Sequence, residues 1–124
     1  MMRAAFTFLL LLVPSLLHAD GLVFEPAVVD ITAQRGAGRA SGEFRFTNTS
    51  PTPVRLRNVA PSCGCIVARP DKREYAPGEK GVIPFTYAPK GREGTKAYRV
   101  FIATSEKGPP VKVILRVTET APRD

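Results

Sequence analysis

The chain has 124 residues and carries 18 Lys and Arg side chains against 11 Asp and Glu, a formal net charge of +7 at pH 7. This length fits one domain and leaves little room for a second. The single His is His18, and both Met are the first two residues. Beyond residue 19 there is therefore no imidazole for a Ser-His-Asp triad, a Cys-His pair or a His-bearing zinc or copper site. These absences predict a protein that is not an enzyme and has no cofactor.

Residues 1–19 have the pattern of a secretion leader. Arg3 precedes an apolar run from Ala4 to Leu17, and Ala19 is the small residue expected before a cleavage site at Asp20. The run is shorter than the about 20 residues that a membrane-spanning helix needs, and Pro14 interrupts it. Cleavage would leave 105 of the 124 residues, with 17 basic and 11 acidic side chains and a formal charge of +6. We predict a periplasmic or secreted protein with no transmembrane segment after leader cleavage; an uncleaved anchor is the alternative.

Beyond the leader, the composition predicts strands and turns. This part holds 11 Val and 5 Ile but only 3 Leu, with 11 Pro and 10 Gly, and β-branched residues favour strands while Pro and Gly interrupt helices. Alternating apolar and polar runs, separated by Gly- and Pro-rich turns, predict strands over 22–24 with 28–32 as a split first strand, then 44–46, 54–57, 66–69, 83–87, 98–102 and 111–117. About seven short strands are typical of an all-β, immunoglobulin-like β-sandwich. We assign residues 20–118 to this domain and residues 119–124 to a flexible tail.

The alternating runs also predict the core. Because successive side chains of a strand point to opposite faces, one residue in two should lie between the two sheets. Pro84 lies inside a predicted strand and lacks the N–H that a ladder needs, which is tolerated mainly at an edge or a bulge. We predict that this strand is an open edge, where another protein can add a strand. The predicted core residues are Phe44, Phe46, Val54, Leu56, Phe85, Tyr98, Val100, Ile102, Val113 and Leu115.

Three of the predicted strands carry basic residues between their core positions. Immunoglobulin strand order places residues 54–57, 98–102 and 111–117 side by side in one sheet. Such a face can dock an anionic glycan, a lipid head group or an acidic protein, or can serve only to keep the protein soluble. Nucleic acid is not a predicted partner of an exported protein, and aromatic residues do not obviously interleave with the arginines as stacking platforms. The outward basic residues are Arg55, Arg57, Arg99, Lys112 and Arg116.

One short motif and several flanking segments resemble a known family. The motif is Ser62-Cys63-Gly64-Cys65, and the segments that accompany it are Val23-Phe24-Glu25-Pro26, Phe44-Arg45-Phe46-Thr47-Asn48-Thr49-Ser50, Ala76-Pro77-Gly78-Glu79-Lys80-Gly81 and Val113-Ile114-Leu115-Arg116-Val117. Over most of its length beyond the leader, the chain resembles the bacterial family known as domain of unknown function 1573, which is related in fold to the ASH and major-sperm-protein domains. The resemblance implies an immunoglobulin-like fold and an exported location, and it implies no activity.

Cys63 and Cys65 are the only cysteines and carry the only distinctive chemistry of the chain. In an extended segment residues i and i+2 point to the same face, and Gly64 lets the backbone fold tightly between them. In an oxidising compartment the pair can close a disulfide, whose small loop would contribute only about 1.5 kcal/mol through chain entropy. The pair can also exchange disulfides with another protein, bind a soft ion such as Cu(I), or pack as two small side chains at a sandwich rim. No metal site is assigned.

Together these features predict an exported, non-catalytic immunoglobulin-like module of the cell envelope with a binding or structural role. The predicted partner is an envelope protein or an anionic surface. The alternative function is a periplasmic thiol-redox or Cu(I)-handling protein that uses Cys63 and Cys65.

Overall fold

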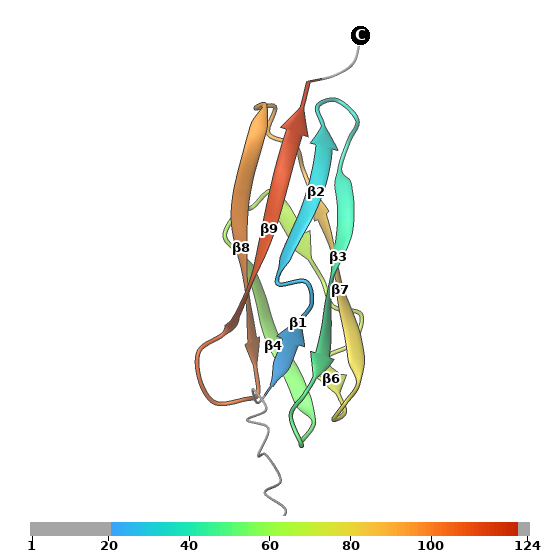
Figure 1. Cartoon of the computed structure of the whole chain (residues 1–124), viewed down its shortest axis with the longest axis vertical. Coiled ribbons are helices and arrows are strands. Elements are labelled where there is room, and N and C mark those ends of the chain that lie inside the picture. The colour runs from blue at the N-terminus through green and yellow to red at the C-terminus, as the bar shows by residue number, and fades with distance from the viewer. Residues whose placement is uncertain (1–20, 122–124) are drawn as a thin grey trace, which may run out of the picture.

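The computed structural model describes residues 21–121, which form nine strands and no helix. The strands run roughly along the long axis of the molecule (Figure 1). In chain order they are β1 (Leu22–Phe24), β2 (Val28–Gln34), β3 (Ala40–Asn48), β4 (Val54–Pro61), β5 (Ile66–Ala68), β6 (Glu74–Tyr75), β7 (Lys80–Tyr87), β8 (Gly94–Thr104) and β9 (Val111–Thr120). The predicted leader and the last three residues of the predicted tail lie outside the described residues. Within residues 21–121, no helix has the length and apolarity to cross a membrane.

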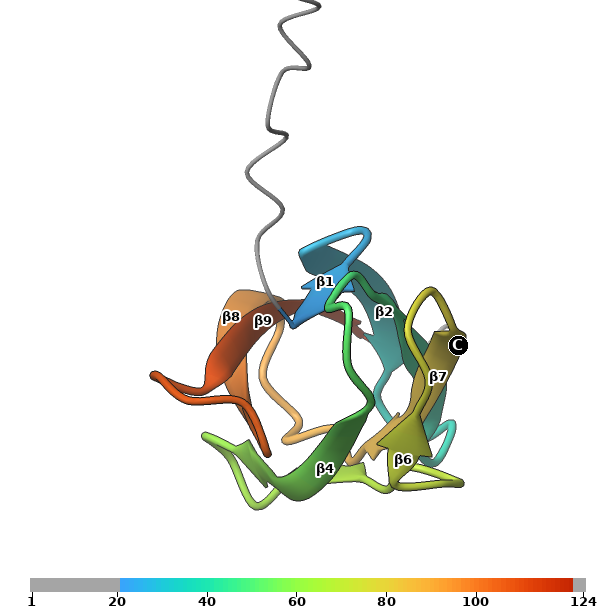
Figure 2. The ribbon, with the colours of Figure 1, turned by 90° about the horizontal axis from the view of Figure 1, so that it is seen from below.

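The strands form two sheets around one core. The four-stranded sheet has the order β1-β3-β7-β5, and the five-stranded sheet has the order β2-β9-β8-β4-β6. β2 runs parallel to β9, and the other paired strands are antiparallel. In Figure 2 the five-stranded sheet curves around the core from β2 through β9, β8 and β4 to β6. The predicted immunoglobulin-like sandwich is confirmed, and the three strands with basic residues, β4, β8 and β9, are neighbours.

The two halves of the split first strand enter different sheets. Phe24 of β1 lies opposite Phe46 of β3, whereas Val28 of β2 lies opposite Ile114 of β9. The chain passes between the sheets at Glu25–Pro26, whose peptide bond is cis. The split was predicted from the local pattern. The choice of different partners was not, because it depends on pairing with β9, more than 80 residues along the chain.

β9 and β6 differ from the sequence expectations. β9 continues to Thr120, which pairs with Gln34, so residues 119 and 120 belong to the sandwich rather than to a tail. β6 is an additional strand of two residues, with Tyr75 opposite Val54. Two residues are too few to show alternation in a sequence, and β6 exists because β4 is available as its partner.

The core lies between the sheets and follows the alternating pattern. Nine of the ten predicted core residues are buried, and Tyr98 is half-buried against them. The rings of Phe44 and Phe85 stack with centroids 4.6 Å apart, and the ring of Phe46 meets that of Tyr75 edge-on at 4.7 Å. Eight further residues complete the core: Leu22, Phe24, Ala33, Ile66, Tyr75, Ile83, Tyr87 and Val117.

Pro84 does not mark an edge strand, so that prediction was wrong. β7 lies between β3 and β5, with Pro84 opposite Glu43 of β3. The carbonyl of Pro84 accepts a hydrogen bond from the N–H of Arg69 at 3.1 Å, just beyond the end of β5. Because the nitrogen and the carbonyl of a strand residue face the same neighbour, the missing donor points toward the place where β5 has ended. The ladder between β3 and β7 therefore loses no hydrogen bond.

A buried asparagine holds the turn after β3. The side chain of Asn48 is fully buried, and its amide nitrogen donates to the carbonyls of Thr52 at 3.1 Å and Tyr75 at 2.9 Å. Its amide oxygen accepts from the N–H of Ser50 at 2.9 Å. These bonds join the β3–β4 turn to β6, and they satisfy a polar side chain that would otherwise be costly to bury.

Candidate functional site

The outer face of the five-stranded sheet brings two of the predicted basic residues together. Arg99 on β8 lies opposite Ile114 on β9, and Lys112 on β9 lies opposite Phe101 on β8. Arg99 and Lys112 are therefore diagonal neighbours on one face, about 7–8 Å apart along the sheet. Both are exposed. They form a compact centre of positive charge.

The other three basic residues are also exposed but are placed differently. Arg116 pairs with Asp30 on β2, with Nη2 3.0 Å from Oδ2, and this hydrogen bond lowers the pKa of the Asp30 carboxyl below its ordinary value. Arg57 lies at a bulge in β4. Arg55 lies near the start of β4, opposite Glu74 of β6. All five residues lie on the outer face of the sheet. The charge of Arg116 is neutralised by Asp30, and Arg55 and Arg57 lie in the first half of β4.

Apolar side chains accompany the diagonal pair at outward positions. Phe101 is 37% exposed and Val28 is 39% exposed. Val28 lies opposite Ile114, and Ala60 of β4 lies opposite Phe101, so that two adjacent rows cross the sheet. The sequence signal for this feature is the presence of Phe101 and Ile114 between core positions. We call the residues of these two rows the outer-face patch: Val28, Ala60, Arg99, Phe101, Lys112 and Ile114.

The outer face of the four-stranded sheet is hollowed by two shallow grooves. Lys80 lines the first groove and Arg69 the second, and Glu43 borders both. Glu43 pairs with Arg45, with Nη2 2.8 Å from Oε1. On this face at least part of the charge is therefore compensated within the protein.

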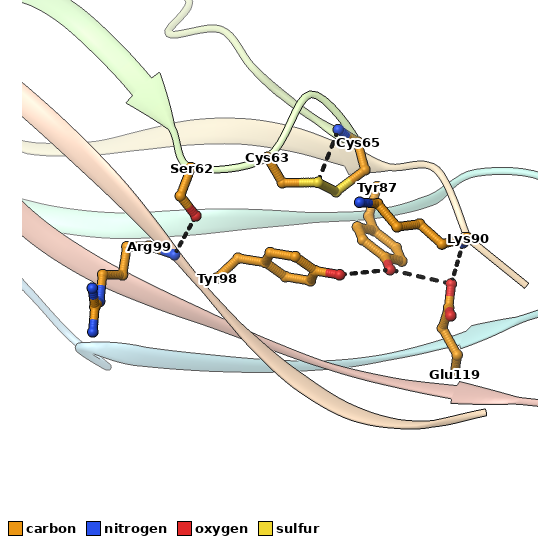
Figure 3. The surroundings of a disulfide bond; sticks show 8 residues. All are labelled: Ser62, Cys63, Cys65, Tyr87, Lys90, Tyr98, Arg99 and Glu119. Carbon is orange, nitrogen blue, oxygen red and sulfur yellow. Dashed lines mark hydrogen bonds between the residues drawn. A yellow bond between two sulfur atoms is a disulfide. The ribbon is translucent and has the colours of Figure 1, made fainter. Parts of the chain in front are cut away.

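Cys63 and Cys65 form a disulfide in the turn between β4 and β5 (Figure 3). Both residues are half-buried against the core, and Gly64 between them is exposed. The N–H of Cys65 donates to Sγ of Cys63 at 3.2 Å. Among residues 21–121, no three His, Cys, Asp or Glu side chains are grouped so that they could hold a metal ion.

The disulfide turn borders the outer-face patch. The N–H of Ser62 donates to the carbonyl of Arg99 at 2.8 Å, and the N–H of Arg99 donates to the hydroxyl of Ser62 at 3.0 Å. Figure 3 shows this second bond beside the disulfide. One residue of the patch is thus tied by its backbone to the residue that precedes Cys63.

A buried carboxylate, Glu119, lies at the same end of the sandwich as the disulfide turn. Glu119 is 7% exposed and accepts hydrogen bonds from the N–H of Lys90 and the hydroxyl of Tyr87, both drawn in Figure 3. It also accepts a hydrogen bond from the N–H of Arg92. Burial raises the pKa of Glu119, but the hydrogen bonds together outweigh burial and lower it below the ordinary value of 4.5. Sequence reasoning missed this residue because it assigned position 119 to the tail.

The lowered pKa of Glu119 predicts a dependence of stability on pH. A carboxyl whose pKa is lower in the folded than in the unfolded protein stabilises the fold above its unfolded value, and this contribution is lost as the pH falls through the folded value. We expect Glu119→Gln to destabilise the protein at pH 7 and the difference from the unmutated protein to shrink below pH 4.5. Urea unfolding of both proteins between pH 7 and pH 3 measures the difference. A constant difference would show that the charge of Glu119 does not matter.

The family model for DUF1573, described as a protein of unknown function, matches residues 22–118. No curated protein matches this chain. The matched range runs from β1 almost to the end of β9.

Solved structures share the fold at low sequence identity. A protein of unknown function from Porphyromonas gingivalis W83 has a TM-score of 0.66 and 20% identity, over 86% of this chain and 50% of that chain. The ASH/PapD-like domain 7 of human CEP192 has a TM-score of 0.62 and 11% identity, over 83% and 87%. The CupB2 chaperone of Pseudomonas aeruginosa has a TM-score of 0.57 and 16% identity, over 78% and 55%. This chain thus spans half the length of the P. gingivalis protein.

At these identities the solved structures establish the architecture alone, and the family match carries the relationship. Because the family model covers the sandwich from β1 into β9, the chain belongs to the DUF1573 family, with an immunoglobulin-like fold of the ASH/PapD-like kind.

Proposed function

We propose that this protein is a non-catalytic binding module of the cell envelope and that it docks an acidic protein partner on the outer-face patch. The observation that carries the proposal is the combination of cations and exposed apolar side chains in that patch. Arg99 and Lys112 form no ion pair among the described residues. Phe101 lies directly opposite Lys112 and two residues along β8 from Arg99.

The two kinds of side chain favour the same kind of partner. Removing exposed apolar surface from water stabilises a complex by about 25 cal/mol per Å². A cation that becomes buried needs a counter-charge, because an unpaired buried charge is strongly destabilising. A polar glycan or lipid head group would leave Phe101 and Ile114 without apolar contacts. A protein surface with Asp or Glu beside apolar side chains satisfies both requirements, and the formal charge of +6 that remains after leader cleavage favours its approach.

Sequence and fold support the other parts of the proposal. The leader pattern of residues 1–19 supports export to the envelope. The only His of the chain lies in that leader, so the domain itself has no imidazole base. The likeness to a chaperone of P. aeruginosa supports protein binding as a use of this fold.

A charge reversal tests the docking surface. We expect the exported protein, used as bait in an envelope extract, to retain an acidic protein partner. Arg99→Glu combined with Lys112→Glu should reduce the retained amount by about tenfold or more, because like charges facing each other across an interface are strongly unfavourable. The retained protein should also dissociate as salt is added.

The matched control changes the net charge equally on the other sheet. Arg69→Glu combined with Lys80→Glu alters the two grooves of the four-stranded sheet and should leave retention unchanged. Both double variants should unfold at the same temperature as the unmutated protein, because all four side chains are exposed. Loss of retention in the control alone would assign binding to the grooves, and equal loss in both would indicate an effect of net charge only.

A further inference from the structure

Beyond docking, we propose that the Cys63–Cys65 disulfide is a thiol–disulfide exchange site whose substrate is a dithiol on another protein. The proposal rests on the disulfide turn itself and does not require the outer-face patch to bind. Three observations carry it: the turn is held without the disulfide, the turn is exposed at Gly64 between the two half-buried cysteines, and the two sulfur atoms differ in their surroundings.

Backbone hydrogen bonds hold the disulfide turn on both sides. The N–H of Ile66 donates to the carbonyl of Cys63 at 3.2 Å, and the N–H of Ala88 donates to the carbonyl of Cys65 at 2.8 Å. Ser62 is bonded twice to Arg99 of β8. A disulfide that joins residues only two positions apart closes so short a loop that it restricts the unfolded chain very little. The bond is therefore dispensable for the fold, and reduction should leave the two sulfur atoms side by side.

The disulfide turn is open to solvent at the residue between the two cysteines. Gly64 is exposed, and a Cβ atom built at this position would meet nothing within 4 Å. Its φ angle lies outside the left-handed region, so the oxidised turn does not require glycine for its backbone conformation. The middle residue of the turn is therefore open to another protein, and the two half-buried cysteines flank it.

The two sulfur atoms are not equivalent. Sγ of Cys63 accepts the N–H of Cys65 at 3.2 Å, and no described hydrogen bond reaches Sγ of Cys65. A hydrogen bond to sulfur stabilises the thiolate more than the thiol, which lowers the pKa of the thiol that receives it. A thiol with a lower pKa is also the better leaving group in exchange. Cys63 is therefore the leaving sulfur, and Cys65 is the sulfur that is attacked.

The exchange takes place in two steps. A thiolate of the partner attacks Sγ of Cys65, the bond between Cys65 and Cys63 breaks, and Cys63 leaves as a thiolate. The second thiolate of the partner attacks the partner sulfur of this mixed disulfide and expels Cys65 as a thiolate. The partner dithiol loses two electrons and becomes a disulfide. The two electrons remain on Cys63 and Cys65, which take up the two protons released by the partner thiols.

Reduction of the native exported protein tests the exchange. We expect reduced glutathione to open the disulfide without denaturant, as shown by alkylation and mass spectrometry, while circular dichroism stays unchanged. The Cys63→Ser, Cys65→Ser double variant should fold with only modest loss of stability. A disulfide that resists glutathione until the protein is unfolded would overturn the proposal. So would one Cu(I) per chain that survives dialysis of the reduced protein and is lost in the double variant, because the pair would then be a metal site.

A matched pair of single variants tests the roles of the two sulfur atoms. In Cys65→Ser the remaining thiol, Cys63, keeps the N–H of residue 65, whereas in Cys63→Ser the remaining thiol has no such donor. We expect the pH midpoint of alkylation to be about one unit lower for Cys63 in Cys65→Ser than for Cys65 in Cys63→Ser. At any pH below both midpoints, Cys63 would then hold about tenfold more thiolate than Cys65. Equal midpoints, or a lower midpoint for Cys65, would overturn the assignment of Cys63 as the leaving sulfur.

Discussion

Truncation of Phe85 to alanine should remove about 3–5 kcal/mol from the free energy of unfolding. The side chain is 2% exposed and stacks on Phe44 with ring centroids 4.6 Å apart. Its ring also lies against Gly42 on the opposite strand, where a Cβ atom would be 2.7 Å from Cζ. Alanine would leave a cavity bounded by both sheets. Because domains of this size are stable by only about 5–15 kcal/mol, we expect Phe85→Ala to unfold the domain or to weaken it severely.

Urea unfolding followed by circular dichroism measures this effect. Arg55→Ala is the control, because Arg55 is an exposed residue on the outer face of β4. It should change the stability by no more than about 0.5 kcal/mol. Small and equal effects of the two substitutions would contradict the assignment of inner and outer faces.

Substitution of Gly81 by alanine should be the second most damaging change. Gly81 lies opposite Phe46 in the ladder between β3 and β7. A Cβ atom at this position would overlap Cζ of Phe46 and would lie 2.5 Å from Cε1 of Tyr75. Both rings are 3% exposed and meet edge-on, so neither can move without displacing the other. Overpacking of this kind costs about 1–3 kcal/mol.

The glycine of the disulfide turn provides the matched control. Gly64 has an ordinary φ angle and open space around its Cα. Gly64→Ala should leave the stability unchanged or raise it by about 0.4–1 kcal/mol, because alanine restricts the unfolded chain. Thermal unfolding of Gly81→Ala and Gly64→Ala side by side distinguishes a steric requirement from a general preference for glycine. Equal losses would contradict the packing described around Gly81.

The sequence was sufficient where a structural property is local. The alternation in residues 98–102 and 111–117 predicted buried Val100, Ile102, Val113 and Leu115, and all four are fully buried. It placed Arg99 and Lys112 on the outer face, where both are exposed. A strand sets the direction of each side chain by its own two-residue repeat, so these features require no knowledge of the partner strands.

The candidate sites could be predicted only in part. Cys63 and Cys65 were identified from their spacing, and the structure joins them in a disulfide. Their chemical role and the binding role of the outer-face patch stay predictions. The sequence did not reveal that Cys65 donates to the sulfur of Cys63, or that Ser62 ties the turn to Arg99. Both contacts depend on how the turn is folded against β8.

By itself, the sequence determined an all-β sandwich, the inner and outer faces of its main strands and the position of the cysteine pair. It could do so because the two-residue repeat of a strand, the residues of a turn and the spacing of the cysteines are properties of neighbouring residues. The order of β4, β8 and β9 followed from the predicted fold class, and the tertiary structure decided the other pairings. It placed β7 between two strands despite Pro84, and it put Asp30 beside Arg116, 86 positions away, which neutralises one predicted cation. It also joined Phe101, Ile114 and Val28 into one patch. Such contacts depend on long-range pairing, whose free energy comes from the whole core and cannot be assigned to any single segment.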